Sequence, residues 1–368
     1  MKDLPVRAGQ RWHAMMPDNN HDEIARQQFV LSLRSGVREN VEPAIRTVFE
    51  KRVAPKLAQN GETKLPEVRR AMLRDPLIQS WSALRRTTWE AQWDVAGEAI
   101  ERDLPRLVDE AAHYRTGKKH HGSLTLDKTV AVPRYNTEIE IHVQPGGYHV
   151  EIADDDVFAG ALWDRVYTVG EPNRGEWGDM AGRGTAAWVK EHYPDLKPTR
   201  ILDMGCTIGQ STIPYVDAFP DAEVHAIDVA APCLRYGFAR SEALGKAIHY
   251  SQQDAERTNF DDASFDIVVS HLLFHETSTK AVQRIFNEIH RVLKPGGVMI
   301  HEDIGNKNDM DTVQRFFFDW MTHYAAEPFI NQWTAVDTFE AAVKAGFPRK
   351  EVFRDGPGKR YFGARKAA

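Results

Sequence analysis

The stretch Arg200-Ile-Leu-Asp-Met-Gly-Cys-Thr-Ile-Gly-Gln210 decides the fold of this chain. A short apolar run ends in Asp203, glycines follow at 205 and 209, and residues 210–218 suit a helix. This order predicts a buried strand, a tight turn and a helix whose free N–H groups face a ligand. Glycine is favoured in such a turn because a Cβ would keep the ligand away from the backbone. The stretch alone is compatible with any adenine-containing cofactor.

Strands and helices alternate from this segment toward the C-terminus. We expect strands at 200–203, 223–228, 247–252, 265–270 and 297–302, near Val352 and at 360–364, and helices around 210–218, 232–244, 279–293, 309–324 and 336–345. Alternation of this kind is typical of a parallel sheet covered by helices on both faces. The sequence therefore predicts an α/β, Rossmann-like fold with a seven-stranded, mostly parallel sheet.

The first part of the chain has a different pattern. Apolar residues recur at helical spacing from 22 to 115, and Pro105 is expected to divide or kink the last helix of this part. Three further segments look like strands that would form a small β appendage: 124–132, 137–143 and 148–152. The acidic run at 154–156 marks the expected boundary. We therefore expect a mainly helical N-terminal domain over 1–155, without a motif of known chemistry, and a second domain over 156–368.

Composition argues against several classes of protein. The chain has 368 residues, which favours two domains, and its net charge of −6 gives no electrostatic signature of nucleic-acid binding. The only two cysteines, Cys206 and Cys233, support neither a disulfide framework nor a zinc site, which favours a reducing compartment. The N-terminus lacks the apolar core of a signal peptide, and no apolar run approaches the roughly 18 residues of a membrane span. We expect a cytoplasmic protein with no nucleic-acid or membrane partner.

Polar side chains stand where the predicted strands end. In a doubly wound sheet, ligands bind outside the carboxyl ends of the strands, near the point where the strand order reverses. Asp203 and Asp228 end the first two predicted strands. The distance between them in the sequence suits a role for Asp228 as the carboxylate that accepts hydrogen bonds from ribose hydroxyls. Asp254 follows the third strand, where it can accept from an adenine amino group, and Ser270-His271 ends the fourth.

This half of the chain resembles the class I S-adenosylmethionine-dependent methyltransferases. The Asp-x-Gly-x-x-x-Gly pattern at 203–209 resembles the first motif of that family, although Thr207 stands where many members have glycine. Asp228 matches the acidic residue of its second strand, and 253–255 matches its adenine-side segment. The segment 260–270 and Leu293-Lys-Pro-Gly-Gly297 resemble the sequences that enter strands four and five. The resemblance covers about 157–368 and implies an antiparallel seventh strand.

The resemblance implies S-adenosylmethionine as the cofactor. Carried over residue by residue, it implies these cofactor-binding positions: Asp203, Gly205, Cys206, Gly209, Asp228, Val229, Asp254, Ala255, Ser270, His271 and Tyr167. A nicotinamide-dependent Rossmann enzyme is the main alternative on fold. That class expects a Gly-x-Gly-x-x-Gly turn, and no third glycine follows Gly209 here.

The expected catalytic residues are His275 and Glu276, just beyond the fourth strand. His275 would act as a general base, since a histidine titrates near neutral pH, and Glu276 would orient it or contact the substrate. The alternative is that His275 only caps the following helix. His271, His275 and Glu276 could also form a metal site with the cluster at 301–303. Strand ends collect polar residues in any case, so we expect no metal.

The acceptor is expected to be a small, apolar or aromatic metabolite, methylated by in-line displacement. Aromatic side chains gather in 157–185 and 310–333, the two segments expected beside the cofactor. The N-terminal domain would either form a homodimer that completes a partner's site or cover the site of its own chain. The alternative function is a methyltransferase-fold protein that acts on a macromolecule or has lost transfer activity, with the N-terminal domain as its interaction module.

Overall fold

An eight-stranded sheet forms the centre of the computed structural model, which describes residues 12–59, 64–170 and 175–368. The strand order is β1-β4-β3-β2-β5-β6-β8-β7, and β8 alone runs antiparallel to its neighbours. The strands are β1 (Ser123–Thr125), β2 (Arg200–Met204), β3 (Glu223–Asp228), β4 (His249–Gln252), β5 (Phe265–His271), β6 (Leu293–Glu302), β7 (Val352–Asp355) and β8 (Tyr361–Arg365). The predicted α/β class is therefore confirmed.

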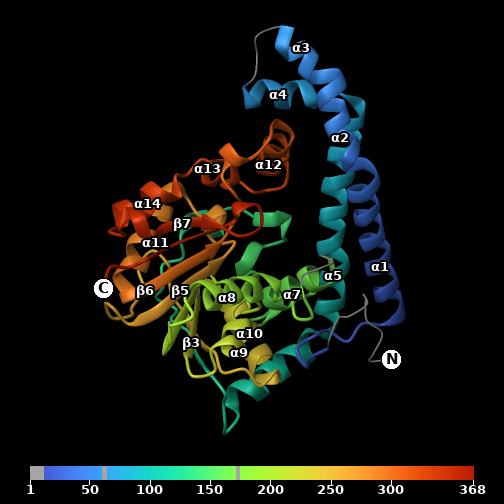
Figure 1. Ribbon diagram of the computed structural model, residues 1–368. Coiled ribbons are helices and arrows are strands. Elements are labelled where there is room, and N and C mark those ends of the chain that lie inside the picture. Colours follow the sequence, from blue (N-terminus) through green and yellow to red (C-terminus); the bar gives the residue numbers. More distant parts are fainter. Residues whose placement is uncertain (1–11, 60–63, 171–174) are drawn as a thin grey trace.

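Helices cover both faces of this sheet (Figure 1). The helices of this part of the chain are α7 (Phe158–Gly170), α8 (Met180–His192), α9 (Ile213–Ala218), α10 (Ala231–Ala243), α11 (Thr279–Val292), α12 (Thr312–Tyr324), α13 (Ile330–Trp333) and α14 (Thr338–Ala345). Helix α12 packs on the N-terminal helices rather than on the sheet. Successive residues of a strand point to opposite faces, so Ile201 packs in one core with α8 while Leu202 packs in another with α11 and α14. Both faces are apolar, as a parallel sheet requires.

The prediction of a small β appendage in the N-terminal part of the chain is wrong. Of the three segments predicted as strands, only Ser123–Thr125 forms one, and it pairs with β4 as the eighth strand of the main sheet. The rest contains the short helix α6 (Arg134–Thr137) and two 3₁₀ turns, Ile141–Val143 and Gly147–His149. The alternating pattern at 137–143 does not extend the chain because His142 and Val143 both have left-handed backbone angles, with φ of 59° and 60°. These residues turn toward the sheet instead.

The N-terminal helices form a long column beside the sheet domain (Figure 1). They are α1 (His21–Gly36), α2 (Glu42–Val48), α3 (Ala54–Gln59), α4 (Leu65–Met72) and α5 (Pro76–Thr116). Pro105 lies inside the 41 residues of α5 and does not divide this segment, while the alternative expectation, a kink at Pro105, stays a prediction. Helix α5 contacts α1, α7 and α10, and this packing outweighs the hydrogen bond that a proline removes.

The N-terminal helices share their core with the rest of the chain. Trp93 and Ile100 of α5 lie in one apolar cluster with Trp163 of α7 and Tyr236 of α10. A second cluster joins Trp81 of α5 to α12. The proposed domain boundary at 155/156 therefore stays a prediction. Among the described residues, no helix is both long and apolar enough to cross a bilayer.

Candidate active site

The turn after β2 is built from left-handed backbone conformations. Gly205, Thr207 and Gly209 have φ of 72°, 52° and 74°. A Cβ on Gly205 would lie 2.6 Å from Leu273 Cδ1, and one on Gly209 would lie 1.9 Å from the Tyr250 hydroxyl oxygen. Both glycines are thus required by close packing as well as by backbone angle. Helix α9 begins at Ile213, three residues later than predicted.

Asp203 leaves one buried oxygen available at the end of β2. The residue is 2% exposed, and its Oδ2 accepts a hydrogen bond from Thr212 Oγ1 at 2.6 Å. Its Oδ1 lies 3.9 Å from His271 Nδ1 and has no hydrogen-bond partner among the described residues. A buried carboxylate oxygen without a donor is costly. This oxygen is a candidate acceptor for a donor group of a bound ligand.

Asp228 fixes the glycine turn from the end of β3. Its Oδ2 accepts from the backbone N–H of Thr207 and its Oδ1 from that of Ala230, both at 2.9 Å. Burial raises the pKa of this carboxyl group, against the effect of these hydrogen bonds. Each oxygen keeps a further lone pair, so Asp228 can anchor the turn and still accept from ligand hydroxyls.

Two adjoining cavities open above these strand ends. The larger encloses about 850 Å³ and the smaller about 450 Å³, and Gly205, Asp228, Leu273 and Glu276 line both. The predicted site residues that line the cavities are Asp203, Gly205, Cys206, Asp228, His271, His275 and Glu276 in the larger, and Gly205, Asp228, Val229, Asp254, Ala255 and Glu276 in the smaller.

For three predicted cofactor-binding residues, the structure shows no side chain that lines either cavity. Gly209 packs against Tyr250 and does not line these two cavities. Ser270 does not line them either, since it is fully buried and its Oγ is 2.7 Å from His301 Nδ1. Tyr167 lies in α7, and its side chain is outside the described part of the structure.

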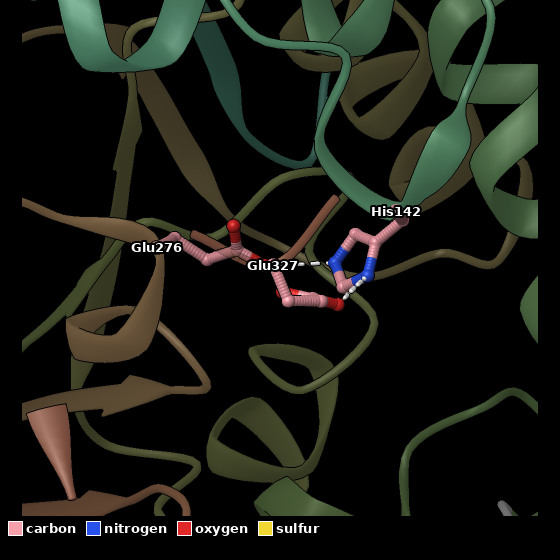
Figure 2. A group of neighbouring side chains, drawn as sticks. All are labelled: His142, Glu276 and Glu327. Atoms are coloured by element: carbon pink, nitrogen blue, oxygen red, sulfur yellow. Dashed lines mark ion pairs between the residues drawn. The ribbon is translucent and has the colours of Figure 1, made fainter. Parts of the chain in front are cut away.

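A row of titratable side chains lies at the larger cavity, which three of them line: His142, His275 and Glu276. His275 Nδ1 is 2.6 Å from Asp303 Oδ1, and His275 Nε2 is 3.5 Å from Glu276 Oε1. Glu276 Oε1 is in turn 2.7 Å from His142 Nε2, and His142 Nδ1 pairs with Glu327. Figure 2 shows both glutamates beside the His142 ring, with dashed lines marking the two ion pairs. The predicted pair His275 and Glu276 is thus part of a larger buried network.

Neighbouring charges within this row favour the charged forms of His275 and Glu276. Burial opposes a charge on that ring, but Asp303, Glu276 and Glu327 outweigh it and raise the pKa of His275 to about 9. Burial raises the pKa of Glu276, but His142 and His275 outweigh it and lower this pKa overall. In this arrangement His275 holds its proton at neutral pH, a state that suits orienting Glu276 better than accepting a proton. The catalytic roles of both residues stay predictions.

Residues of the supposed β appendage supply a wall that sequence reasoning missed. His142 and Tyr148 line the larger cavity, and the Tyr148 and Trp163 rings lie 5.0 Å apart beside it. Trp93 of α5 holds this wall, since its Nε1 donates to the His142 carbonyl at 2.9 Å. No local motif marks His142 or Glu327, because each reaches the site only through the packing of distant segments.

Comparison with known proteins identifies the sheet domain. A family model described as a methyltransferase domain matches residues 201–297. Demethylmenaquinone methyltransferase of Thermus thermophilus is 31% identical over 159 residues, which is 43% of this chain and 71% of that protein. Malonyl-[acyl-carrier protein] O-methyltransferase of Methylococcus capsulatus is 35% identical over 109 residues, 29% of this chain. The latter match spans only 38% of that relative's length.

A solved structure is similar as well. It is phosphoethanolamine N-methyltransferase 2 of Haemonchus contortus in complex with S-adenosyl-L-methionine. The identity is 24%, the TM-score is 0.37, and the match covers 46% of this chain and 37% of that one.

Proposed function

Because this chain belongs to the class I S-adenosylmethionine-dependent methyltransferases, we propose that it methylates a small metabolite bound in the larger cavity. The cavity joins the glycine turn to a wall of aromatic and titratable side chains, and this is the observation that carries the proposal. When bound, S-adenosylmethionine supplies an electrophilic methyl group. The protein's task is then to align the acceptor and to exclude water.

The residues at the strand ends fit this cofactor. Gly205 lines both cavities without a side chain that would displace Leu273, and Asp228 offers carboxylate lone pairs where the two cavities adjoin. Val229, Asp254 and Ala255 line the smaller cavity, where an adenine ring would lie. The unpartnered Oδ1 of Asp203 suits a donor group such as the cofactor's amine. These assignments follow the family motif and are proposals for this chain.

The acceptor would lie against the wall formed by Tyr148, Trp163 and Glu276. The two aromatic rings favour an apolar or aromatic body, and the Glu276 carboxylate favours an acceptor with a hydroxyl or amine donor. The name of the Thermus relative gives demethylmenaquinone as its acceptor, which supports a small molecule of this kind. His275, held by Asp303, would position Glu276.

The N-terminal helices would cover the site of their own chain. The hydrogen bond from Trp93 of α5 to the His142 carbonyl supports this account, since it ties the helical column directly to the cavity wall. A homodimer through the same helices is the other account. Light scattering of the full chain separates the two, because a fully active monomer would contradict a partner-completed site.

The function is tested with isotopically labelled S-adenosylmethionine and two classes of acceptor. We expect transfer to small phenols, quinols or amines, and none to ribosomal RNA or to a lysate protein fraction. Transfer to a macromolecule alone would overturn the acceptor class, because the acceptor wall lies inside a cavity. Failure to bind S-adenosylmethionine by calorimetry would overturn the activity itself.

A further inference from the structure

Three side chains from separate segments meet beside the larger cavity, which His142 and Glu276 line (Figure 2). His142 comes from the loop after α6, Glu276 from the turn after β5, and Glu327 from the segment between α12 and α13. One ligand atom from each residue lies within 4.8 Å of the other two. Ligand atoms about 2.1 Å from a tetrahedral ion lie about 3.4 Å apart, so the widest pair must approach by about 1 Å for the three atoms to share one ion.

The cluster is buried and carries unpartnered oxygen atoms. The side chains of His142, Glu276 and Glu327 are 9%, 12% and 1% exposed. Oε2 of Glu276 and Oε2 of Glu327 are both buried without a hydrogen-bond partner among the described residues. Each oxygen therefore lacks the donor or cation that a buried carboxylate needs.

Charge around the cluster is also unbalanced. In residues 12–59, 64–170 and 175–368, no lysine or arginine pairs with Glu276 or Glu327. The nearby Asp303 adds a third carboxylate, which pairs with His275. Buried carboxylates in proteins are normally paired with cations or coordinate metals. Even if both imidazoles were protonated, their two positive charges would not balance the negative charges of three carboxylates.

We propose that His142, Glu276 and Glu327 bind a divalent first-row transition-metal ion such as Zn²⁺ or Mn²⁺. One imidazole nitrogen with two carboxylates suits these ions, whereas Mg²⁺ and Ca²⁺ prefer oxygen ligands alone. The ring can give the metal only one nitrogen, so ion binding releases the proton that the ring shares with the carboxylates. Three protein ligands leave coordination positions open, as catalytic metal sites do.

The surrounding structure holds the ligands in place. The His142 N–H donates to the carbonyl of Ala326 at 3.3 Å, which fixes the His142 loop beside the segment that carries Glu327. Trp93 holds the His142 carbonyl from α5. His275 and Asp303 support Glu276 in the way that outer-shell residues support metal ligands. His142 and Glu276 line the cavity, so an ion that they held would lie beside the proposed acceptor position.

Metal binding itself does not rest on the proposed methyl transfer. The role of the ion in catalysis, in contrast, rests on the proposed methyl transfer. An ion at this wall would polarise an acceptor oxygen or nitrogen, lower its pKa and fix its orientation. The metal site considered from the sequence alone involved only His271, His275, Glu276 and residues 301–303. His142 and Glu327 lie far from these residues in the sequence.

The test titrates the chelator-treated full chain with ZnCl₂, MnCl₂ and MgCl₂ by calorimetry. We expect one equivalent of Zn²⁺ or Mn²⁺ per chain and affinity for Mg²⁺ lower by at least about tenfold. Glu327→Gln should weaken binding of the preferred ion by about 100-fold, since it removes one charged ligand at nearly constant volume. Glu288→Gln is the matched control, because Glu288 is also buried but pairs with Arg291, and it should bind the ion like the unaltered chain.

Two results would overturn the metal site. One is no uptake of Zn²⁺ or Mn²⁺ by the unaltered chain. The other is equal affinity in Glu327→Gln and His142→Asn variants whose Tm matches that of the unaltered chain. Binding of S-adenosylmethionine, measured on the same samples, keeps the two proposals distinct. Cofactor binding without metal uptake defeats only the metal site, and metal uptake without cofactor binding defeats only the proposed methyl transfer.

Discussion

A single carboxylate at the end of β3 organises the cofactor turn. Asp228 accepts hydrogen bonds from the backbone of Thr207 and Ala230, so it holds the turn after β2 against the start of α10. This contact stabilises Thr207 in a left-handed conformation that a β-branched residue rarely adopts. The same carboxylate lines both cavities. The turn geometry thus depends on a side chain that the proposed function also assigns to cofactor binding.

Asp228→Asn tests this dual role. The amide nitrogen cannot accept from a backbone N–H, so one of the two hydrogen bonds is lost and the charge disappears. We expect affinity for S-adenosylmethionine to fall by about tenfold or more, which is about 1.4 kcal/mol. Calorimetry measures the change, with the surface variant Asp217→Asn as the control. Equal affinity in both variants would contradict the assignment of Asp228.

His301 shows how a histidine can serve the core rather than the site. It is fully buried in β6, where its Nδ1 lies 2.7 Å from Ser270 Oγ. Burial, assisted by the neighbouring His271, lowers the pKa of His301 from 6.5 to about 3. The folded state therefore keeps the ring neutral at pH values where the unfolded chain protonates it.

Stability should consequently fall as the pH decreases. The contribution of His301 is fully present above pH 6.5 and is lost progressively as the pH falls from 6.5 toward 3. By pH 5 the loss amounts to about 2 kcal/mol in the free energy of unfolding. Urea denaturation at pH 7.5 and pH 5.0 should show a smaller decrease for His301→Leu than for the unaltered chain. The exposed His21→Leu variant should retain the full decrease.

At the scale of elements, α5 connects the helical column to the cavity. The helix spans Pro76–Thr116, which at 1.5 Å per residue is about 60 Å. It shares one apolar cluster with α7 and α10 and another with α12. Trp93, in the cluster with α7 and α10, donates to the His142 carbonyl. The position of the cavity wall therefore depends on a helix outside the family motif.

Trp93→Phe should reduce methyl transfer without affecting cofactor affinity. The ring retains most of its packing, but the His142 carbonyl loses its donor, which lets the wall shift. We expect kcat to fall by about tenfold, since small misplacements of aligned groups are costly, while calorimetric affinity for S-adenosylmethionine is unchanged. Trp320→Phe is the control, because it removes a similar indole hydrogen bond, to Ser82, in the other cluster. Equal kcat values in both variants would contradict a positioning role for α5.

At the scale of the whole molecule, the helical column and the sheet domain share their apolar cores. Trp163 of α7 and Tyr236 of α10 pack against Trp93 and Ile100 of α5. A chain cut at the expected boundary would expose these faces of α7 and α10 to water. Exposed apolar surface of that extent promotes aggregation. The two parts are expected to fold as one unit.

Truncation tests this expectation directly. We expect residues 156–368, produced alone, to aggregate or to unfold without a cooperative transition. Residues 12–368, which keep Met15 and the rest of the shared cluster, should unfold cooperatively. Circular dichroism during heating distinguishes the outcomes. A soluble 156–368 fragment with a Tm equal to that of the longer chain would show that the boundary at 155/156 separates independent domains.

Local sequence determined the parts of this protein that depend on neighbours along the chain. The alternation of apolar and polar runs predicted the α/β sheet, and the motif around Asp203 and Asp228 predicted the side chains at the strand ends. Such features follow from strand periodicity, from glycine's backbone freedom and from the parallel alignment of strand ends. They identify the methyl donor.

Only the tertiary structure decided what surrounds the acceptor. Residues 137–143 alternate like a strand, yet packing against α5 turns them into a loop that brings His142 to Glu276 and Glu327. The free energy that favours this loop comes from burial and hydrogen bonds with segments about 50 to 185 residues away in the chain, and no local pattern records those contacts. The turn after β2 can therefore be predicted from the sequence, whereas the wall proposed for the acceptor forms only when distant segments pack together.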